Sequence, residues 1–257
     1  PRNFNDEVAW LYLMTDDVEM GQLELDPDDE NNDTRDKNSS DAFNVGEGEE
    51  PYKWEREIKS YTDNFWERRY GNILACNLVI DALPEMVYVE ADSGSYNFLA
   101  AQAYAMRAYH YWCLVNSYAL PWSEENLDKP GVIIRTEPQI DISARGRSSI
   151  RDVYDLINED IEKAERYIKV ATFDGNIHRL SEPAILLLAS RIALFQENWD
   201  EVIRTGELFL AQNSVILNLN DQDTTLFGKE RGTGTEPFTM MDGVKNKEIV
   251  FTFGTSS

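Results

Sequence analysis

Two histidines, His110 and His178, are the only imidazoles in this chain that could serve as a general base. His110 lies within an apolar helical pattern rich in tyrosine, and His178 lies in a polar loop. The sequence has no Gly-x-Ser-x-Gly elbow, no phosphate-binding glycine loop and no dinucleotide fingerprint. Nucleophilic catalysis needs a nucleophile beside a base, so the sequence argues against a Ser-His or Cys-His enzyme and predicts no cofactor.

Carboxylate pairs are the second kind of side chain that could do chemistry here. Asp16 and Asp17, at the end of a predicted helix, are the foremost pair. Glycoside hydrolysis requires two carboxylates that face each other. An exposed acidic helix end does no chemistry, and we favour that interpretation. A carboxylate-dependent glycoside hydrolase is kept as an alternative.

The acidic run that begins at Asp26 resembles a calcium-binding loop at first sight. An EF-hand loop starting there would need glycine at position 31 and glutamate at position 37. The chain has Asn31 and Lys37 instead, so the motif fails. The sequence therefore predicts no metal site and a solvated loop.

Aromatic residues outside helical patterns are the candidates for ligand binding. An exposed tryptophan or tyrosine can stack on the C–H face of a sugar ring, while nearby amide or charged groups bind its hydroxyls. The candidates are Phe43, Asn44, Tyr52, Trp54, Arg56 and Trp122. A second interpretation, in which the rings fasten the loop to the helices, stays open.

The charge of the chain restricts its partners. The formal net charge is −23, from 47 acidic and 24 basic residues. Residues 16–50 hold 14 acidic and two basic residues, about half of the net charge. Phosphate backbones and anionic lipid surfaces would be repelled, so we expect no nucleic-acid partner and no basic membrane-docking patch.

Hydrophobic periodicity predicts a series of helices joined by polar segments. Side chains Ser149 and Ser181 are predicted to cap two of the helices, the first with Asp152 in a capping box. The predicted helices cover residues 6–15, 58–83, 96–118, 149–168, 181–195 and 199–212. An acidic loop covers residues 16–57, and short strands are predicted at 132–134 and 249–253.

The last two predicted helices form a hairpin over residues 181–212. Small residues predict close packing within it, namely Ala189, Ser190, Ala193 and Gly206. This layout is that of a tetratricopeptide-type unit, which must stack on neighbouring helices to bury its apolar face. We predict an all-α, tetratricopeptide-like α-α superhelix with long irregular loops and minor strands, in a single domain over residues 1–257.

Most helix aromatics recur at helical spacing and are predicted to be core residues, among them Trp66, Tyr70, Tyr104, Tyr109 and Trp112. Two polar residues on the same faces need partners if they are buried. Asn77 is expected to bond a backbone group. Arg107 is expected to bond buried carbonyls or a carboxylate such as Asp81.

The succession of motifs resembles the SusD/RagB family. The motifs are Trp66-x3-Tyr70-x2-Ile73-x3-Asn77, then Ala103-x3-Arg107-Ala108-Tyr109-x2-Trp112, with further agreement at 6–17, 116–121, 147–164 and 184–202. Two departures are Ala119, where the family usually has glycine, and Trp112, where phenylalanine is frequent. Family members are longer than this chain, so the resemblance implies that the C-terminal part of the family fold is missing here.

The resemblance implies a role in nutrient uptake without bond cleavage. A SusD-like protein captures oligosaccharide or polysaccharide at the outer membrane and passes it to a SusC-like TonB-dependent transporter. It would be a lipoprotein, surface-exposed or periplasm-facing, with a lipid-anchored cysteine upstream of Pro1. A tetratricopeptide-type protein-interaction scaffold is a further alternative, although the long loops and the lack of a clean repeat speak against it.

Overall fold

The computed structural model describes residues 64–139, 143–216 and 248–252. The chain divides into two compact units, Pro1–Arg68 and Arg69–Ser257. Apart from the first turn of α3, every described helix belongs to the second unit. The predicted helix at 6–15 and the acidic loop at 16–57 lie outside the described residues. The single domain over residues 1–257 stays a prediction.

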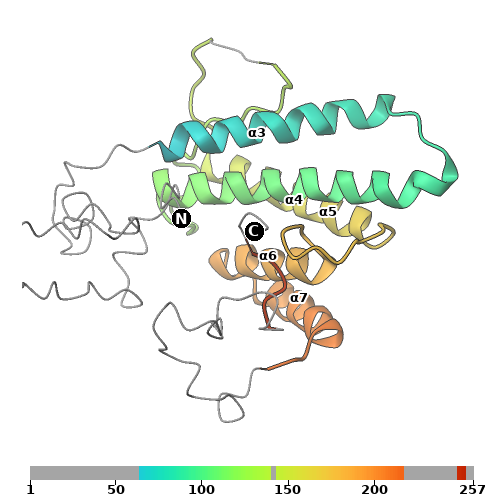
Figure 1. Cartoon of the computed structure of the whole chain (residues 1–257). Coiled ribbons are helices and arrows are strands. Elements are labelled where there is room, and N and C mark those ends of the chain that lie inside the picture. The colour runs from blue at the N-terminus through green and yellow to red at the C-terminus, as the bar shows by residue number, and fades with distance from the viewer. Residues whose placement is uncertain (1–63, 140–142, 217–247, 253–257) are drawn as a thin grey trace, which may run out of the picture. The chain divides into compact units, whose positions relative to one another are not determined.

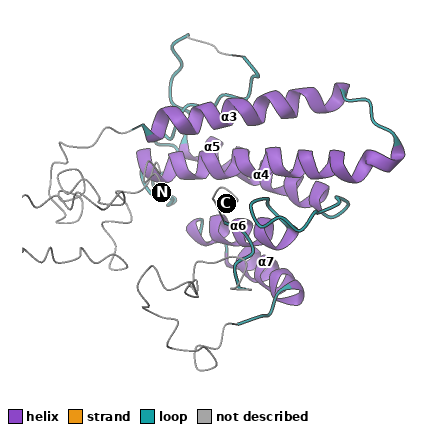
Figure 2. Cartoon of the chain, in the orientation of Figure 1, coloured by secondary structure: helices purple, strands orange, loops and turns teal. Residues whose placement is uncertain are grey.

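Within the described residues the fold is all-α, as the sequence predicts (Figure 2). Two short 3-10 turns, Leu83–Glu85 and Glu90–Asp92, join the first two helices. The α-helices are α3 (Phe65–Ala82), α4 (Ser93–Tyr118), α5 (Ile150–Ile168), α6 (Glu182–Phe195) and α7 (Trp199–Gln212). None of the described helices is long and apolar enough to cross a membrane.

Helix boundaries follow local signals in the sequence. The predicted capping box is present, because the Ser149 side chain accepts a hydrogen bond from the Asp152 amide and Asp152 accepts one from the Ser149 amide. The Ser181 side chain caps α6 by accepting a hydrogen bond from the Ala184 amide. The helix predicted from residue 58 instead begins at Phe65, since the adjacent Asn64 is not helical.

Helix α4 lies at the centre of the packing, with α3 antiparallel to it and α5 against it (Figure 1). Small side chains allow this close approach, since Ala101, Ala105 and Ala108 are fully buried on α4. Next to α5, helices α6 and α7 form the predicted hairpin. One core cluster joins α4, α5 and α6; it includes Phe98, Ala101, Ala105, Ala164, Ile168, Leu180, Ala184 and Ile185.

The hairpin turn explains how α6 reverses into α7. Glu197 adopts a left-handed backbone conformation with φ of 55°, and the Asn198 side chain then caps α7 by accepting from the Glu201 amide. Ala189 and Ala193 are buried, as close packing requires. The prediction for Gly206 is wrong, because a Cβ built there would meet nothing within 4 Å.

The predicted strand at 132–134 is not formed. Only an isolated antiparallel bridge joins Pro130 to Ser149 in this loop. The carbonyl oxygens of Ile133 and Arg135 accept hydrogen bonds from side chains on α3 and α4 instead of from a neighbouring strand. The described residues 249–252 of the second predicted strand are also irregular, although the Thr252 amide donates to the Ile177 carbonyl oxygen at 3.0 Å.

Candidate functional site

Five of the six sequence-predicted binding residues lie outside the described residues, namely Phe43, Asn44, Tyr52, Trp54 and Arg56. The sixth, Trp122, is half-buried and makes an edge-to-face contact with Tyr154 of α5, with ring centroids 4.8 Å apart. Because Tyr154 is fully buried, this contact fastens the loop after α4 onto α5. A sugar-binding role for Trp122 stays a prediction.

A buried polar network joins three helices. Arg107 on α4 donates to both carboxylate oxygens of Asp160 on α5 at 2.7 Å and to Asn77 Oδ1 on α3 at 2.9 Å. Burial raises the pKa of Asp160, while the hydrogen bonds from Arg107 favour its charged form. Asp81, suggested from the sequence as a partner of Arg107, does not have this role, because its side chain is exposed. The network therefore positions α3, α4 and α5 relative to one another.

Asn77 and two tyrosines hold the long loop between α4 and α5. Asn77 is buried, and its Nδ2 donates to the carbonyl oxygens of Arg135 at 3.0 Å and Glu137 at 3.3 Å, so the expected bond to a backbone group is present. The Tyr111 hydroxyl bonds both backbone groups of Arg135, at 2.7 and 2.8 Å. Tyr70 donates to the Ile133 carbonyl oxygen, and burial raises the pKa of Tyr70 to about 12. Tyr70 is thus structural, as predicted, and Tyr111 has a structural role that the sequence analysis did not assign.

Neither histidine is placed as a general base. His110 is 3% exposed, and burial, together with Arg69, lowers the pKa of its imidazole to about 3. Its Nδ1 lies 3.1 Å from the Arg69 guanidinium, so a neutral ring accepts this hydrogen bond. His178 Nδ1 lies 3.1 Å from the Thr252 carbonyl oxygen and joins two loops. Among the described residues, no group of His, Cys, Asp or Glu could hold a metal ion.

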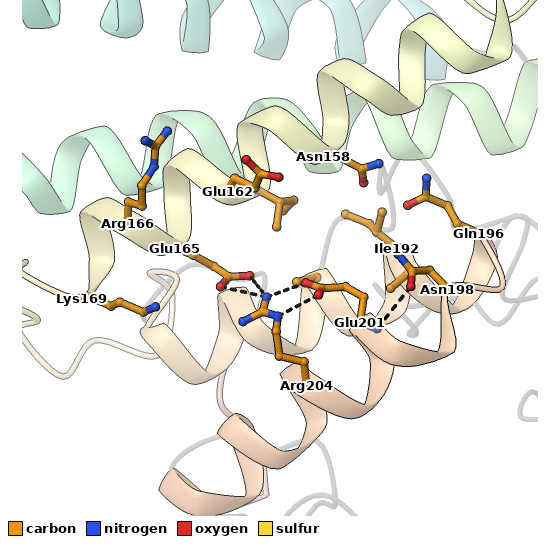
Figure 3. A pocket seen from close by; sticks show the side chains of 13 residues that line it. Asn158, Glu162, Glu165, Arg166, Lys169, Ile192, Gln196, Asn198, Glu201 and Arg204 are labelled. Carbon is orange, nitrogen blue, oxygen red and sulfur yellow. Dashed lines mark hydrogen bonds and ion pairs between the residues drawn. The ribbon is translucent and has the colours of Figure 1, made fainter.

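A groove of about 510 Å³ opens between α5, α6 and α7, a volume typical of small-ligand sites. Figure 3 draws its 13 lining side chains. The apolar part comes from Ile161, Ala189, Ile192 and Ala193, and the uncharged polar part from Asn158, Gln196 and Asn198. The groove therefore combines an aliphatic surface with hydrogen-bonding amides.

An ion-paired cluster joins α5 to α7 at this groove. Arg204 reaches between Glu165 and Glu201 (Figure 3), with nitrogen–oxygen distances of 2.8 and 2.5 Å. Hydrogen bonds to Glu201 and to Glu165 raise the pKa of Arg204 above its ordinary value. Both glutamates are thus engaged by the same guanidinium, which ties α5 to α7 at the edge of the groove.

The charges of the groove balance. Three acidic residues (Glu162, Glu165 and Glu201) face three basic residues (Arg166, Lys169 and Arg204). A neutral, polar ligand suits such a surface better than a strongly charged one, because no net charge there would favour a counter-ion.

Sequence reasoning did not single out this groove. One signal was available, since Asn158, Glu162, Glu165 and Lys169 recur at spacings of four, three and four on α5 and so share a polar face. That α7 presents Glu201 and Arg204 to this face depends on tertiary packing, which no helical period reveals.

A family description matches most of the chain. A family of SusD-like proteins, described as starch-binding and associating with the outer membrane, matches residues 3–194. A SusD-like protein of Formosa agariphila is 26% identical over 158 residues, which cover 60% of this chain and 27% of that protein. The chain thus spans about a quarter of the length of this curated relative.

Solved structures share the fold. A putative sugar-binding protein of Bacteroides vulgatus superposes with a TM-score of 0.57 and 22% identity, covering 64% of this chain and 36% of that one. A laminarin-binding SusD-like protein gives a TM-score of 0.50 and 18% identity, covering 64% of this chain and 33% of that one. At these identities the likeness concerns the fold.

Proposed function

Because this chain belongs to the SusD-like family, we propose that it takes part in capturing oligosaccharide or polysaccharide at the outer membrane, without cleaving it. The observation that carries the proposal is the family match over residues 3–194. The description of that family as starch-binding and the laminarin-binding relative support a glycan as the ligand. Delivery to a SusC-like TonB-dependent transporter, and a lipid anchor at the outer membrane, belong to the same proposal.

The chemistry of the described residues supports capture rather than hydrolysis. A glycosidase needs one protonated carboxyl group as general acid and a second carboxylate facing it. Glu165 and Glu201 share the guanidinium of Arg204 instead. The pKa of the buried His110 imidazole lies far below its ordinary value. The carboxylate pair Asp16–Asp17 lies outside the described residues.

We propose two surfaces for sugar contact. The loop residues Phe43, Asn44, Tyr52, Trp54 and Arg56 are the proposed stacking and hydroxyl-binding groups. Trp122, whose ring already contacts Tyr154, is proposed as a weaker contact. The groove between α5 and α7 is the second surface, because its neutral charge balance and its amides suit a hydroxyl-rich, uncharged ligand.

A binding and turnover experiment tests the proposal. The purified chain is titrated with soluble starch and with laminarin, and the incubated glycans are analysed for shortened products. Binding with intact glycans is the expected result. Shortened products would overturn the claim that the protein does not cleave its ligand, and no binding to either glucan or to a wider glycan array would overturn glycan capture.

A matched pair of variants tests the groove. Gln196 lines the groove at the end of α6, whereas Gln212 is exposed at the end of α7 and does not line it. Loss of one hydrogen bond to sugar by Gln196→Ala should weaken binding by about 1 kcal/mol. Gln212→Ala should leave binding unchanged. Equal affinities for the two variants would remove the groove from the proposed site.

A further inference from the structure

Two tyrosines stack at the turn between α3 and α4. The rings of Tyr88 and Tyr96 lie 4.4 Å apart between centroids, with an interplanar angle of 21°. Tyr96 belongs to the first turns of α4, and its hydroxyl donates to the Leu83 carbonyl oxygen at 3.2 Å. Tyr96 is therefore fixed between the end of α3 and the start of α4. Its ring in turn fixes the orientation of Tyr88.

The outer face of Tyr88 is open to solvent. The side chain is 46% exposed although one face of its ring is covered by Tyr96. Because Tyr96 covers one face of the ring, we infer that the exposed part of the ring is its opposite face and its edge. Tyr88 lies in the turn rather than on a helix, so no core position explains it. A ring held in place with one face open is already organised for stacking, which lowers the entropy lost on binding.

The neighbouring residues of the turn are apolar or acidic. Met86, Val87 and Val89 are exposed beside Tyr88, and Val87 is fully exposed. Residues 81–92 contain four acidic residues and no basic residue. Exposed patches of this kind mark interaction sites.

The chemistry of the turn selects among ligands. The exposed carboxylates of Glu85, Glu90 and Asp92 accept hydrogen bonds from hydroxyl groups and repel anions. An organic cation is best held by several rings around it, whereas Tyr88 offers a single open face. A ring with apolar C–H groups on one side and hydroxyls at its edge matches both the aromatic face and the carboxylates.

We propose that the outer face of Tyr88 is a saccharide-stacking position that takes neutral pyranose rings, in addition to the contacts proposed above. Tyr96 is a positioning residue, because its hydroxyl bonds the end of α3 and its ring stacks on Tyr88. This inference rests on the proposed glycan capture and adds a contact at the turn between α3 and α4. It makes Tyr88 a determinant of affinity for uncharged glycans.

Three variants of the complete 257-residue chain test the position, with soluble starch and laminarin as probes. Tyr88→Ala removes the ring and should weaken binding of at least one probe about 10-fold. Tyr88→Phe keeps the ring and should stay within about threefold of the unaltered chain, since stacking needs the ring and not the hydroxyl. Val87→Ala, at the adjacent and fully exposed side chain, should bind as the unaltered chain does.

The outcomes separate this inference from the proposed function. Unchanged binding by Tyr88→Ala would overturn the stacking position and leave glycan capture intact. If the unaltered chain binds neither the two glucans nor any glycan of a wider array, glycan capture and the stacking position fail together. A melting temperature that falls in Tyr88→Ala along with affinity would mean that the ring acts through packing, and this too would overturn the inference. Equal losses in Val87→Ala and Tyr88→Ala would show that the aromatic ring is not the determinant of glucan binding and would also overturn the inference.

Discussion

Arg107 on α4 donates hydrogen bonds to both carboxylate oxygens of Asp160 on α5, each at 2.7 Å. The exposed fractions of the two side chains are 6% and 0%. A third bond reaches Asn77 of α3, whose amide holds the long loop through Arg135 and Glu137. This single ion pair thus connects three helices and the loop between α4 and α5. Removing one partner of a buried pair leaves an uncompensated charge, which is costly.

We expect Asp160→Asn to destabilise the protein by about 3–5 kcal/mol, because the Arg107 guanidinium would be buried without a counter-charge. Chemical denaturation measures this loss. Asp155→Asn, on the exposed side of the same helix, is the matched control and should change stability by less than about 0.5 kcal/mol. Equal losses in the two variants would show that the ion pair does not stabilise the native fold.

Local signals in the sequence predict most ends of the described helices, but they do not identify which side chains contact one another across helices. Ser149 and Ser181 marked two helix starts because capping is local, and the 3.6-residue period placed α7 without error. The sequence predicts a carboxylate as one possible partner for Arg107, and a carboxylate is the partner, but it is Asp160 and not the suggested Asp81. Asp160 lies on the apolar face of α5 between Ile157 and Ile161, so the pattern contained the signal.

Features that depend on tertiary contacts were missed. Residues 132–134 have the composition of a strand, but the Ile133 carbonyl oxygen accepts a hydrogen bond from Tyr70 of α3, and only the Val132 carbonyl oxygen accepts one from a backbone amide, that of Ser148. Gly206 suggested close packing, yet it faces open space. The groove and the stacked Tyr88 arise where separate elements meet, and no residue spacing along one helix predicts such a meeting.

His110 makes stability depend on pH. Its folded-state pKa of about 3 lies below the ordinary value of 6.5. Between these two pH values the unfolded chain therefore binds a proton at His110 that the folded chain does not bind. This contribution to stability is present above pH 6.5 and is lost as pH falls toward 3. The slope approaches about 1.4 kcal/mol per pH unit.

His110→Gln removes this titration and keeps an acceptor for Arg69. Denaturation midpoints measured from pH 6.5 down to about 5 should therefore fall less steeply in His110→Gln than in the unaltered protein. Because the same carboxylates are present in both proteins, their contribution to the pH dependence cancels in the comparison. Parallel profiles would contradict a buried neutral His110.

Gly94 is required by a close approach between the start of α4 and the segment after α5. A Cβ at this position would lie 2.9 Å from the Thr172 Cβ and 3.3 Å from the Thr172 backbone nitrogen. We expect Gly94→Ala to lower the unfolding free energy by about 1–3 kcal/mol. Gly206→Ala is the control, because open space surrounds Gly206 in the middle of α7, and alanine there should stabilise by about 0.5–1 kcal/mol. Changes of the same sign in the unfolding free energies of Gly94→Ala and Gly206→Ala would contradict the close packing at Gly94.

Trp54→Ala and Tyr52→Ala test the proposed loop contacts. Each should weaken glycan binding by about 1–3 kcal/mol, since a buried aromatic contact often dominates a binding site. The melting temperature should stay constant if the rings serve the ligand. Titration with starch and laminarin gives the affinity, and thermal unfolding gives the stability. A fall in stability equal to the fall in binding energy would identify the rings as packing residues.

Trp122→Ala should lower the stability of the protein more than its affinity for glycans. Its ring already contacts the buried Tyr154 edge to face at 4.8 Å and fastens the loop after α4 onto α5. Loss of that contact and of the half-buried ring should lower stability by about 1–2 kcal/mol. Glycan affinity, measured where both proteins are folded, should change less than in Trp54→Ala. A large loss of affinity without a loss of stability would instead make Trp122 a sugar-contacting residue, because a ring that only packs has no means of changing affinity in a protein that remains folded.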